Sequence, residues 1–313
     1  MIVQGSTPLF AIILCTHNGE RYIGEQLESI ALQTYSTFVV FIHDWGSSDR
    51  TLEIVSEFAK AHPRMVVVQS HSAAPGPCES YLESLKLVPN PKSFDYFLFC
   101  DQDDFWVSCK LERLAETILE TGADLITHDV EIVDSDLQEV HDSFYRASKY
   151  FNPPYAHNMS RIIANPVPGM SMCFSKQVAI AIIKLEMSVY SSIIMHDWLV
   201  LLIVISNEYK SVFINERLVK YRQHNSNIMG FGKRSVSDIV LHLPSYFGRV
   251  NSQYTSIEDH IGKRISSPYV LLNVLVDKSL TFRYRIFLIP VVVCIVLRRL
   301  AGRVYNLFDN SRN

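Results

Sequence analysis

Short apolar runs alternate with amphipathic segments over the first 70 residues. Continuous apolar runs at residues 9–15, 38–42 and 65–68 are typical of buried strands. Between them, residues 20–34 and 51–61 carry apolar side chains at helical spacing. This β-α-β-α-β order predicts an α/β fold with a mostly parallel central sheet flanked by helices.

The alternation continues beyond a Pro/Gly/Ala loop and weakens after residue 133. The pattern predicts helices at 81–88, 110–121 and 199–205, and strands at 96–100, 124–133 and 212–214. Gly122 is a suitable C-terminal cap for the second of these helices. Residues 134–168 are rich in aromatic residues, Asn and Pro, and the periodic pattern is weak there.

Acidic residues follow the predicted strand at 96–100, namely Asp101, Asp103 and Asp104, with Gln102 between them. Open parallel sheets bind ligands just beyond the carboxyl ends of their strands. Three carboxylates at such a place repel one another unless a cation lies between them, and Mg²⁺ or Mn²⁺ suits oxygen ligands shared with substrate phosphates. A solvated acidic loop is one alternative. The start of the helix at 110–121, where acids are favoured, is another.

Composition narrows the class of protein. The chain has 313 residues and a net charge of −3, so it offers no general attraction to nucleic acid. Its six cysteines include no CxxC pair, which favours reduced thiols over a disulfide framework or a zinc site. Residues 1–8 lack the basic and apolar regions of a signal peptide, so a cytoplasmic location is expected.

The C-terminal part contains an uncharged apolar run at residues 286–297. Arginines flank it on both sides, at Arg283, Arg285, Arg298, Arg299 and Arg303. As a helix the run would span roughly 18 Å, against roughly 30 Å for a bilayer core. We therefore expect residues 283–303 to lie on a membrane surface without crossing it. The alternative is a buried segment that closes the core.

Four polar motifs resemble those of family 2 glycosyltransferases with the GT-A fold. They lie at residues 15–22 with 25–35, at 43–51, at 101–106 with 110–111, and at 196–198 with 221–227. Bacterial rhamnosyltransferase-like members look most similar, because they combine Asp-Gln-Asp-Asp, His-Asp-Trp and Tyr-Arg-Gln-His motifs. The resemblance covers roughly residues 9–232. It implies a GT-A domain at 1–232. The apolar run at 286–297 and its flanking arginines predict a helical, membrane-associated extension at 233–313.

The resemblance also implies roles for individual residues. Asp101 and Asp103 match the Asp-x-Asp pair that holds Mg²⁺ or Mn²⁺ and the donor diphosphate, Asp104 matches a neighbouring acid, and Asp197 matches the catalytic base. Positions that line or close the donor site correspond to Thr16, His17, Asn18, Asp44, Arg222 and His224. Taken by themselves, Asp197 is equally an N-cap of the following helix and residues 220–227 are a solvated loop.

The predicted site also includes the two neighbours of Asp197, and two residues that differ from the family pattern. His196 orients Asp197 or has a packing or capping role, and Trp198 forms a wall. Trp45 stands where the family usually has a second acid that reads the base, and His17 replaces a common Tyr. A tryptophan cannot accept a hydrogen bond from a pyrimidine N–H, but it can stack or shape the pocket.

These observations predict an inverting, metal-dependent glycosyltransferase of surface-polysaccharide (O-antigen or capsule) assembly. The expected donor is dTDP-rhamnose, with a UDP-sugar as the competitor. The expected acceptor is a lipid-linked glycan at the cytoplasmic face of the inner membrane. A nucleotidyl- or phosphotransferase is disfavoured by the single glycine at residues 16–20. A non-catalytic nucleotide- or glycan-binding module is the remaining alternative.

Overall fold

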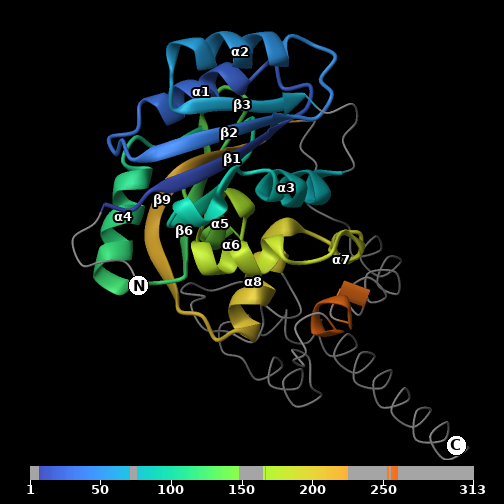
Figure 1. Cartoon of the computed structure of the whole chain (residues 1–313). Helices are drawn as coiled ribbons and strands as arrows, with labels where there is room; N and C mark the ends of the chain where they lie inside the picture. The colour runs from blue at the N-terminus through green and yellow to red at the C-terminus, as the bar shows by residue number, and fades with distance from the viewer. Residues whose placement is uncertain are drawn as a thin grey trace, which may run out of the picture.

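The computed structural model describes residues 7–70, 76–147, 165, 167–224, 252–253 and 255–259. Within these residues nine strands form one sheet in the order β3-β2-β1-β4-β8-β6-β9-β5, with β7 paired to β6 (Figure 1). The predicted extension at 233–313 lies outside the described residues except for 252–253 and 255–259. Gln253 and Ile257 in those pieces are buried, and the Gln253 side chain accepts a hydrogen bond from the Ile194 N–H.

The first half of the chain forms the expected alternating layers. The strands are β1 (Phe10–Thr16), β2 (Phe38–Asp44), β3 (Met65–Ser70) and β4 (Tyr96–Cys100), and the helices are α1 (Ile23–Ala31), α2 (Thr51–Ala61) and α3 (Pro77–Lys86), with a 3₁₀ turn η1 (Pro91–Ser93). All neighbours among these four strands are parallel, so the predicted parallel sheet is confirmed here.

The second half makes the sheet mixed. Its strands are β5 (Phe105–Trp106), β6 (Leu125–Val133), β7 (Glu139–His141), β8 (Met172–Ser175) and β9 (Ser211–Arg222), and its helices are α4 (Lys110–Thr121), α5 (Phe144–Ala147), η3 (Gly169–Ser171), α6 (Lys176–Ile183), α7 (Met187–Tyr190) and α8 (His196–Ser206). Strand β8 is antiparallel to both β4 and β6. Helix α4 has the predicted bounds and ends at Gly122, whose φ of +60° suits a glycine cap.

Side chains that alternate along β1 face two different cores. Phe10, Ile12 and Leu14 pack with α1, α2 and α4. Ala11 and Ile13 pack with α3, α6 and α8, and α8 is buried on every side over most of its length. Figure 1 shows α1 and α2 above the strands and α6 and α8 below them. Burial on both faces explains why these strands are continuously apolar.

The register of the parallel strands sets where the polar loops begin. Thr16 at the end of β1 pairs with Asp44 at the end of β2, and Leu14 pairs with Cys100 at the end of β4. The loops after β1, β2 and β4 therefore leave the sheet at one edge. No helix within the described ranges is long and apolar enough to cross a membrane. The run at residues 286–297 lies outside those ranges.

Candidate active site

The acidic loop, residues 101–104, leaves the sheet directly after β4. Helix α4 begins at Lys110, after the short strand β5, so Asp103 and Asp104 do not start that helix. The Tyr81 hydroxyl lies 2.5 Å from Asp101 Oδ1 and 2.8 Å from the Cys100 carbonyl oxygen. The alternative of a helix N-terminus is therefore wrong, and helix α3 holds the loop through Tyr81.

Three carboxylates are crowded in this loop. Burial raises the pKa of Asp101 to about 6, and the charge of Asp103 adds to the effect. Asp104 is fully buried, and its burial followed by the charges of Asp101 and Asp103 raises its pKa well above the usual range. Asp104 Oδ1 accepts the Arg222 N–H, while Oδ2 has no donor among the described residues. Ionising all three groups is therefore costly without added positive charge.

A buried lysine lies beneath the loop but supplies only part of that charge. Lys110 is fully buried, donates from Nζ to the Met170 carbonyl oxygen at 2.7 Å, and lies 3.7 Å from the centre of the Trp106 ring. Burial lowers the pKa of Lys110 to about 7, against the opposing effects of Cys100 and Asp104. At neutral pH its ammonium form is therefore only partly populated.

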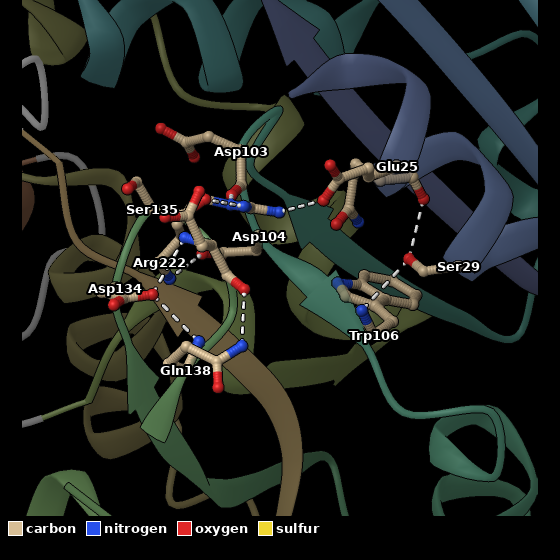
Figure 2. Close-up of polar contacts among 11 residues, drawn as sticks. Glu25, Ser29, Asp103, Asp104, Trp106, Asp134, Ser135, Gln138 and Arg222 are labelled. Carbon is tan, nitrogen blue, oxygen red and sulfur yellow. Dashed lines mark hydrogen bonds and ion pairs between the residues drawn. The ribbon is translucent and has the colours of Figure 1, made fainter. Parts of the chain in front are cut away.

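Arg222 lies in strand β9 and not in a solvated loop. Its guanidinium donates to the Asp103 carbonyl oxygen at 2.8 Å, to the Ser135 carbonyl oxygen at 2.5 Å and to Glu25 Oε2 at 2.5 Å (Figure 2). It also lies 4.4 Å from the Tyr22 ring centre, and its side chain is 1% exposed. The expectation of a solvated loop is thus wrong for 220–222, because pairing with β6 and β5 extends β9 to this point. In this structure the Arg222 side chain therefore links the acidic loop to neighbouring segments of the chain.

His224 brings an imidazole, a second type of ligand, to the acidic loop. Its Nε2 lies 2.8 Å from Asp103 Oδ2, and its ring packs 4.9 Å from that of Tyr22. Two carboxylates and an imidazole are ligands that Mn²⁺ or Mg²⁺ can take, although imidazole suits the softer ion better. Within the described residues, no three His, Cys, Asp or Glu side chains are already arranged to hold a metal ion. The carboxylates and the imidazole are chemically suited to such an ion, but their present hydrogen bonds would have to rearrange before they could bind it.

The loops after β1 and β2 form a hydrogen-bonded pair. Asp44 is fully buried: Oδ1 accepts from the Thr16 hydroxyl at 2.9 Å and the Ser47 hydroxyl at 2.5 Å, and Oδ2 accepts the Ser47 N–H. The Asn18 N–H donates to Ser47 Oγ, and Asn18 Oδ1 accepts the Ser48 N–H at 2.8 Å. The hydrogen bonds that Asp44 accepts from Thr16 and Ser47 thus fix the shape of these two loops.

The two departures from the family pattern contact one another. His17 Nδ1 lies 2.8 Å from the Trp45 carbonyl oxygen, which can only accept, so Nδ1 carries the proton. The other ring nitrogen then accepts from Asn18 Nδ2 at 3.2 Å. Trp45 is 3% exposed, so its side chain is buried. Trp45 therefore shapes the wall from behind, while the exposed His17 faces solvent.

The predicted base lies at the start of α8. The N-cap of α8 is Met195, so the alternative that Asp197 is the N-cap is wrong, although Asp197 Oδ1 accepts the Trp198 N–H at 2.7 Å in the first turn. Burial raises the pKa of Asp197 to about 7, and the charge of Asp101 contributes. A carboxyl group with this pKa can accept a proton near neutral pH. Trp198 is buried in the core below, so its observed role is packing.

His196 joins Asp197 to the acidic loop. Its ring lies 4.2 Å from the Tyr81 ring and 4.9 Å from the Phe99 ring, and burial lowers its pKa to about 3. It is therefore neutral at physiological pH. A Cβ at Gly169 would lie 2.7 Å from His196 Nε2, so only glycine allows η3 to approach the start of α8 this closely. The site thus includes Tyr81, which no chemical motif indicates beyond its place on an amphipathic helix.

Comparisons with known proteins show which chains and folds this protein is similar to. The chain is 26% identical to dTDP-rhamnosyl transferase RfbG of Shigella flexneri over 231 residues, which are 69% of this chain and 73% of that protein. A structure of Staphylococcus aureus TarS 1–349 with UDP-GlcNAc is 19% identical and covers 85% of this chain and 76% of its own, with a TM-score of 0.56. A mannosyltransferase of Pyrobaculum calidifontis with GDP-Man and Mn²⁺ is 13% identical and covers 95% and 88%, with a TM-score of 0.50.

The structural similarity confirms the GT-A fold. The model of the family described as glycosyl transferase family 2 matches residues 11–178, more than half of the chain. This match decides against the phosphotransferase and non-catalytic alternatives. The chain belongs to glycosyl transferase family 2.

Proposed function

We propose that this glycosyltransferase moves a sugar from a nucleoside diphosphate to an acceptor hydroxyl with inversion at the anomeric carbon. One arrangement carries the proposal: the carboxyl group of Asp197 is buried in the first turn of α8, close enough to the acidic loop for the charge of Asp101 to contribute to its raised pKa. A base on one side and a carboxylate cluster on the other are the parts that a single displacement requires.

The residues of this chain would divide the reaction between them. Asp197 takes the proton of the acceptor hydroxyl, and the oxygen then forms a bond to the anomeric carbon. The bond from that carbon to the diphosphate breaks, and its electron pair leaves with the diphosphate oxygen. Thr16, Asn18 and Asp44 shape the wall for the nucleoside through the hydrogen bonds between their loops.

A divalent cation is part of the proposal. Asp101, Asp103 and His224 would hold it, because these side chains lie at the acidic loop and too little positive charge surrounds the carboxylates to balance them. When bound, the cation would neutralise the charge that develops on the leaving diphosphate. The mannosyltransferase neighbour, whose structure contains Mn²⁺, supports this assignment.

We infer dTDP-rhamnose as the donor, because a dTDP-rhamnosyl transferase is among the relatives. A UDP-sugar is the competitor, since the TarS neighbour binds UDP-GlcNAc. A thermal-shift panel of dTDP, UDP and GDP, with and without Mn²⁺, tests this on wild type and Asp103→Ala. Ligands that bind the native state raise the melting temperature by mass action.

We expect dTDP to give the largest metal-dependent shift and Asp103→Ala to lose it. A larger shift with UDP would retain the reaction and change the donor. No shift with any diphosphate would contradict the proposed donor site. Turnover of dTDP-rhamnose with a polyprenyl-linked glycan acceptor would then test the reaction itself.

The acceptor and the location of the protein are a separate part of the proposal. We propose a lipid-linked glycan acceptor at the cytoplasmic face of the inner membrane, because arginines flank the apolar run at 286–297. Deleting residues 283–313 should move the protein from the membrane fraction to the soluble fraction. Unchanged recovery with membranes would refute the membrane contact and leave the reaction unaffected.

A further inference from the structure

Gln102, the residue between the two predicted metal-binding aspartates, binds the backbone of His17. Its Oε1 accepts the His17 N–H at 2.9 Å, and its Nε2 donates to the His17 carbonyl oxygen at 3.1 Å. The two residues are 85 positions apart in the chain. One primary amide thus pairs with both polar groups of a single backbone residue, and it joins the acidic loop to the loop at residues 16–20.

The neighbouring Gly19 leaves the space that this pairing needs. A Cβ at Gly19 would lie 2.3 Å from Gln102 Oε1 and 2.6 Å from Gln102 Cδ. Both atoms are at the end of a flexible side chain, so an added methyl group would displace the amide and leave the backbone where it is. Gly19 is therefore explained by the close approach of Gln102.

Residues 16–20, which we call the nucleotide loop, are also fixed on their other side. The Gly19 N–H donates to Thr51 Oγ1 at 2.7 Å, and the Glu20 N–H donates to Asp49 Oδ2 at 3.2 Å. The loop is thus held between the start of α2 and the acidic loop. Moving Gln102 would change the position of one loop relative to the other without removing either.

We propose that Gln102 is a positioning residue that couples the two ends of the donor site, so that binding of the nucleoside and of the cation reinforce one another. The inference rests on the proposed function, which puts the nucleoside at the nucleotide loop and the cation at the acidic loop. Such coupling is reciprocal: each ligand strengthens the other by the same factor.

Isothermal titration calorimetry measures this factor directly. The Kd of UDP and of dTDP is determined with and without saturating Mn²⁺, and the ratio of the two values is the coupling factor. For Gln102→Ala we expect this factor to fall by about tenfold, which is within the usual range of coupling between sites. The Kd of the nucleoside diphosphate without Mn²⁺ should change by less than about threefold, as both loops remain.

A double-mutant cycle separates positioning from general damage. Gly19→Ala should lower the coupling factor as Gln102→Ala does, because it displaces the same amide. The double variant should be no worse than Gln102→Ala alone, since the side chain that meets the new methyl group is gone. Gln177→Ala is the matched control: this exposed glutamine of α6 hydrogen-bonds Asp124 away from the site and should leave the factor unchanged.

The two proposals fail in different ways. If wild type binds no nucleoside diphosphate more tightly with Mn²⁺, the metal-dependent donor site itself is refuted. If wild type shows the coupling and both single variants keep it, the role of Gln102 is refuted while the donor site stands. Additive losses in the double variant would show that Gly19 and Gln102 act independently, which would also overturn the inference.

Discussion

Two polar regions meet at the carboxyl edge of the sheet, and they differ in how completely their charges are matched. In the loops after β1 and β2, both oxygens of Asp44 accept hydrogen bonds. Although burial acts to raise the pKa of Asp49, hydrogen bonds from the hydroxyl and N–H of Thr51 lower it overall. In the acidic loop, by contrast, the pKa values of Asp101 and Asp104 are raised.

The difference indicates that the two regions would respond differently when a ligand binds. The first region already has its final hydrogen bonds, so a nucleoside would meet a formed wall. In the second region the negative charges of the carboxylates are not balanced, and added positive charge would stabilise their ionised forms. The following predictions test that contrast, from the largest expected effect to the smallest.

Replacing the proposed base, Asp197, should have the largest effect. Asp197→Asn keeps the shape of the residue and cannot accept the proton, so we expect kcat to fall by about 10²–10⁴-fold, the usual contribution of a general base. The Kd of the nucleoside diphosphate with Mn²⁺ should stay within about threefold of wild type. A variant that retained more than a tenth of kcat would exclude Asp197 as the base.

Replacing Arg222 tests whether this residue stabilises the fold or binds the donor. Arg222→Lys loses the fork that reaches Glu25 and two carbonyl oxygens, so we expect urea denaturation to show a loss of about 3 kcal/mol in the free energy of unfolding. Arg217→Lys, a partly exposed arginine on the same strand, is the control and should lose less than about 1 kcal/mol. Weaker diphosphate binding with unchanged stability would instead support the family's donor-site role for Arg222.

The raised pKa values predict how stability depends on pH. The pKa of Asp197 is about 7 in the folded protein against 3.8 for an ordinary aspartate, so the folded state holds its proton over this window while the unfolded chain does not. The free energy of unfolding should therefore fall as pH rises from about 4 to about 7, on the order of 3 kcal/mol from this group.

Denaturation in chelator at pH 5 and pH 8 checks this dependence. Asp197→Asn should gain stability relative to wild type at pH 8 compared with pH 5, because the asparagine has no proton to lose. An equal difference between the two proteins at both pH values would contradict the raised pKa.

Asp44→Asn tests the matched region and should have the smallest effect. An amide nitrogen in place of one oxygen would face the donors of Thr16 or Ser47, so we expect a loss of about 2 kcal/mol in the free energy of unfolding. Asp134→Asn, which alters a carboxylate that accepts two backbone N–H groups in the turn between β6 and β7, is the control and should cost less. A stabilised Asp44→Asn would show that this carboxylate is also electrostatically strained.

Local patterns were sufficient for the parallel half of the fold and for the acidic loop. Apolar runs of four to seven residues separated by amphipathic helices predict β1 to β4, because burial on both faces of a sheet requires them. The rule that ligands bind at the carboxyl ends of strands then points to Asp44 and Asp101. Helix α4 was predicted with its observed bounds, since its apolar stripe and its glycine cap are both local signals.

Contacts between distant segments were decided only by the tertiary structure. A polar run such as 220–222 resembles a loop until β5 and β6 pair with it, and the pairing then buries Arg222 against Asp103, 119 positions away. The same holds for Tyr81 on Asp101 and for Gln102 on His17. Periodicity is local, so the amino-acid pattern alone predicts which residues lie at the ends of strands. Which of them touch depends on strand order and register, and no short stretch of sequence encodes these.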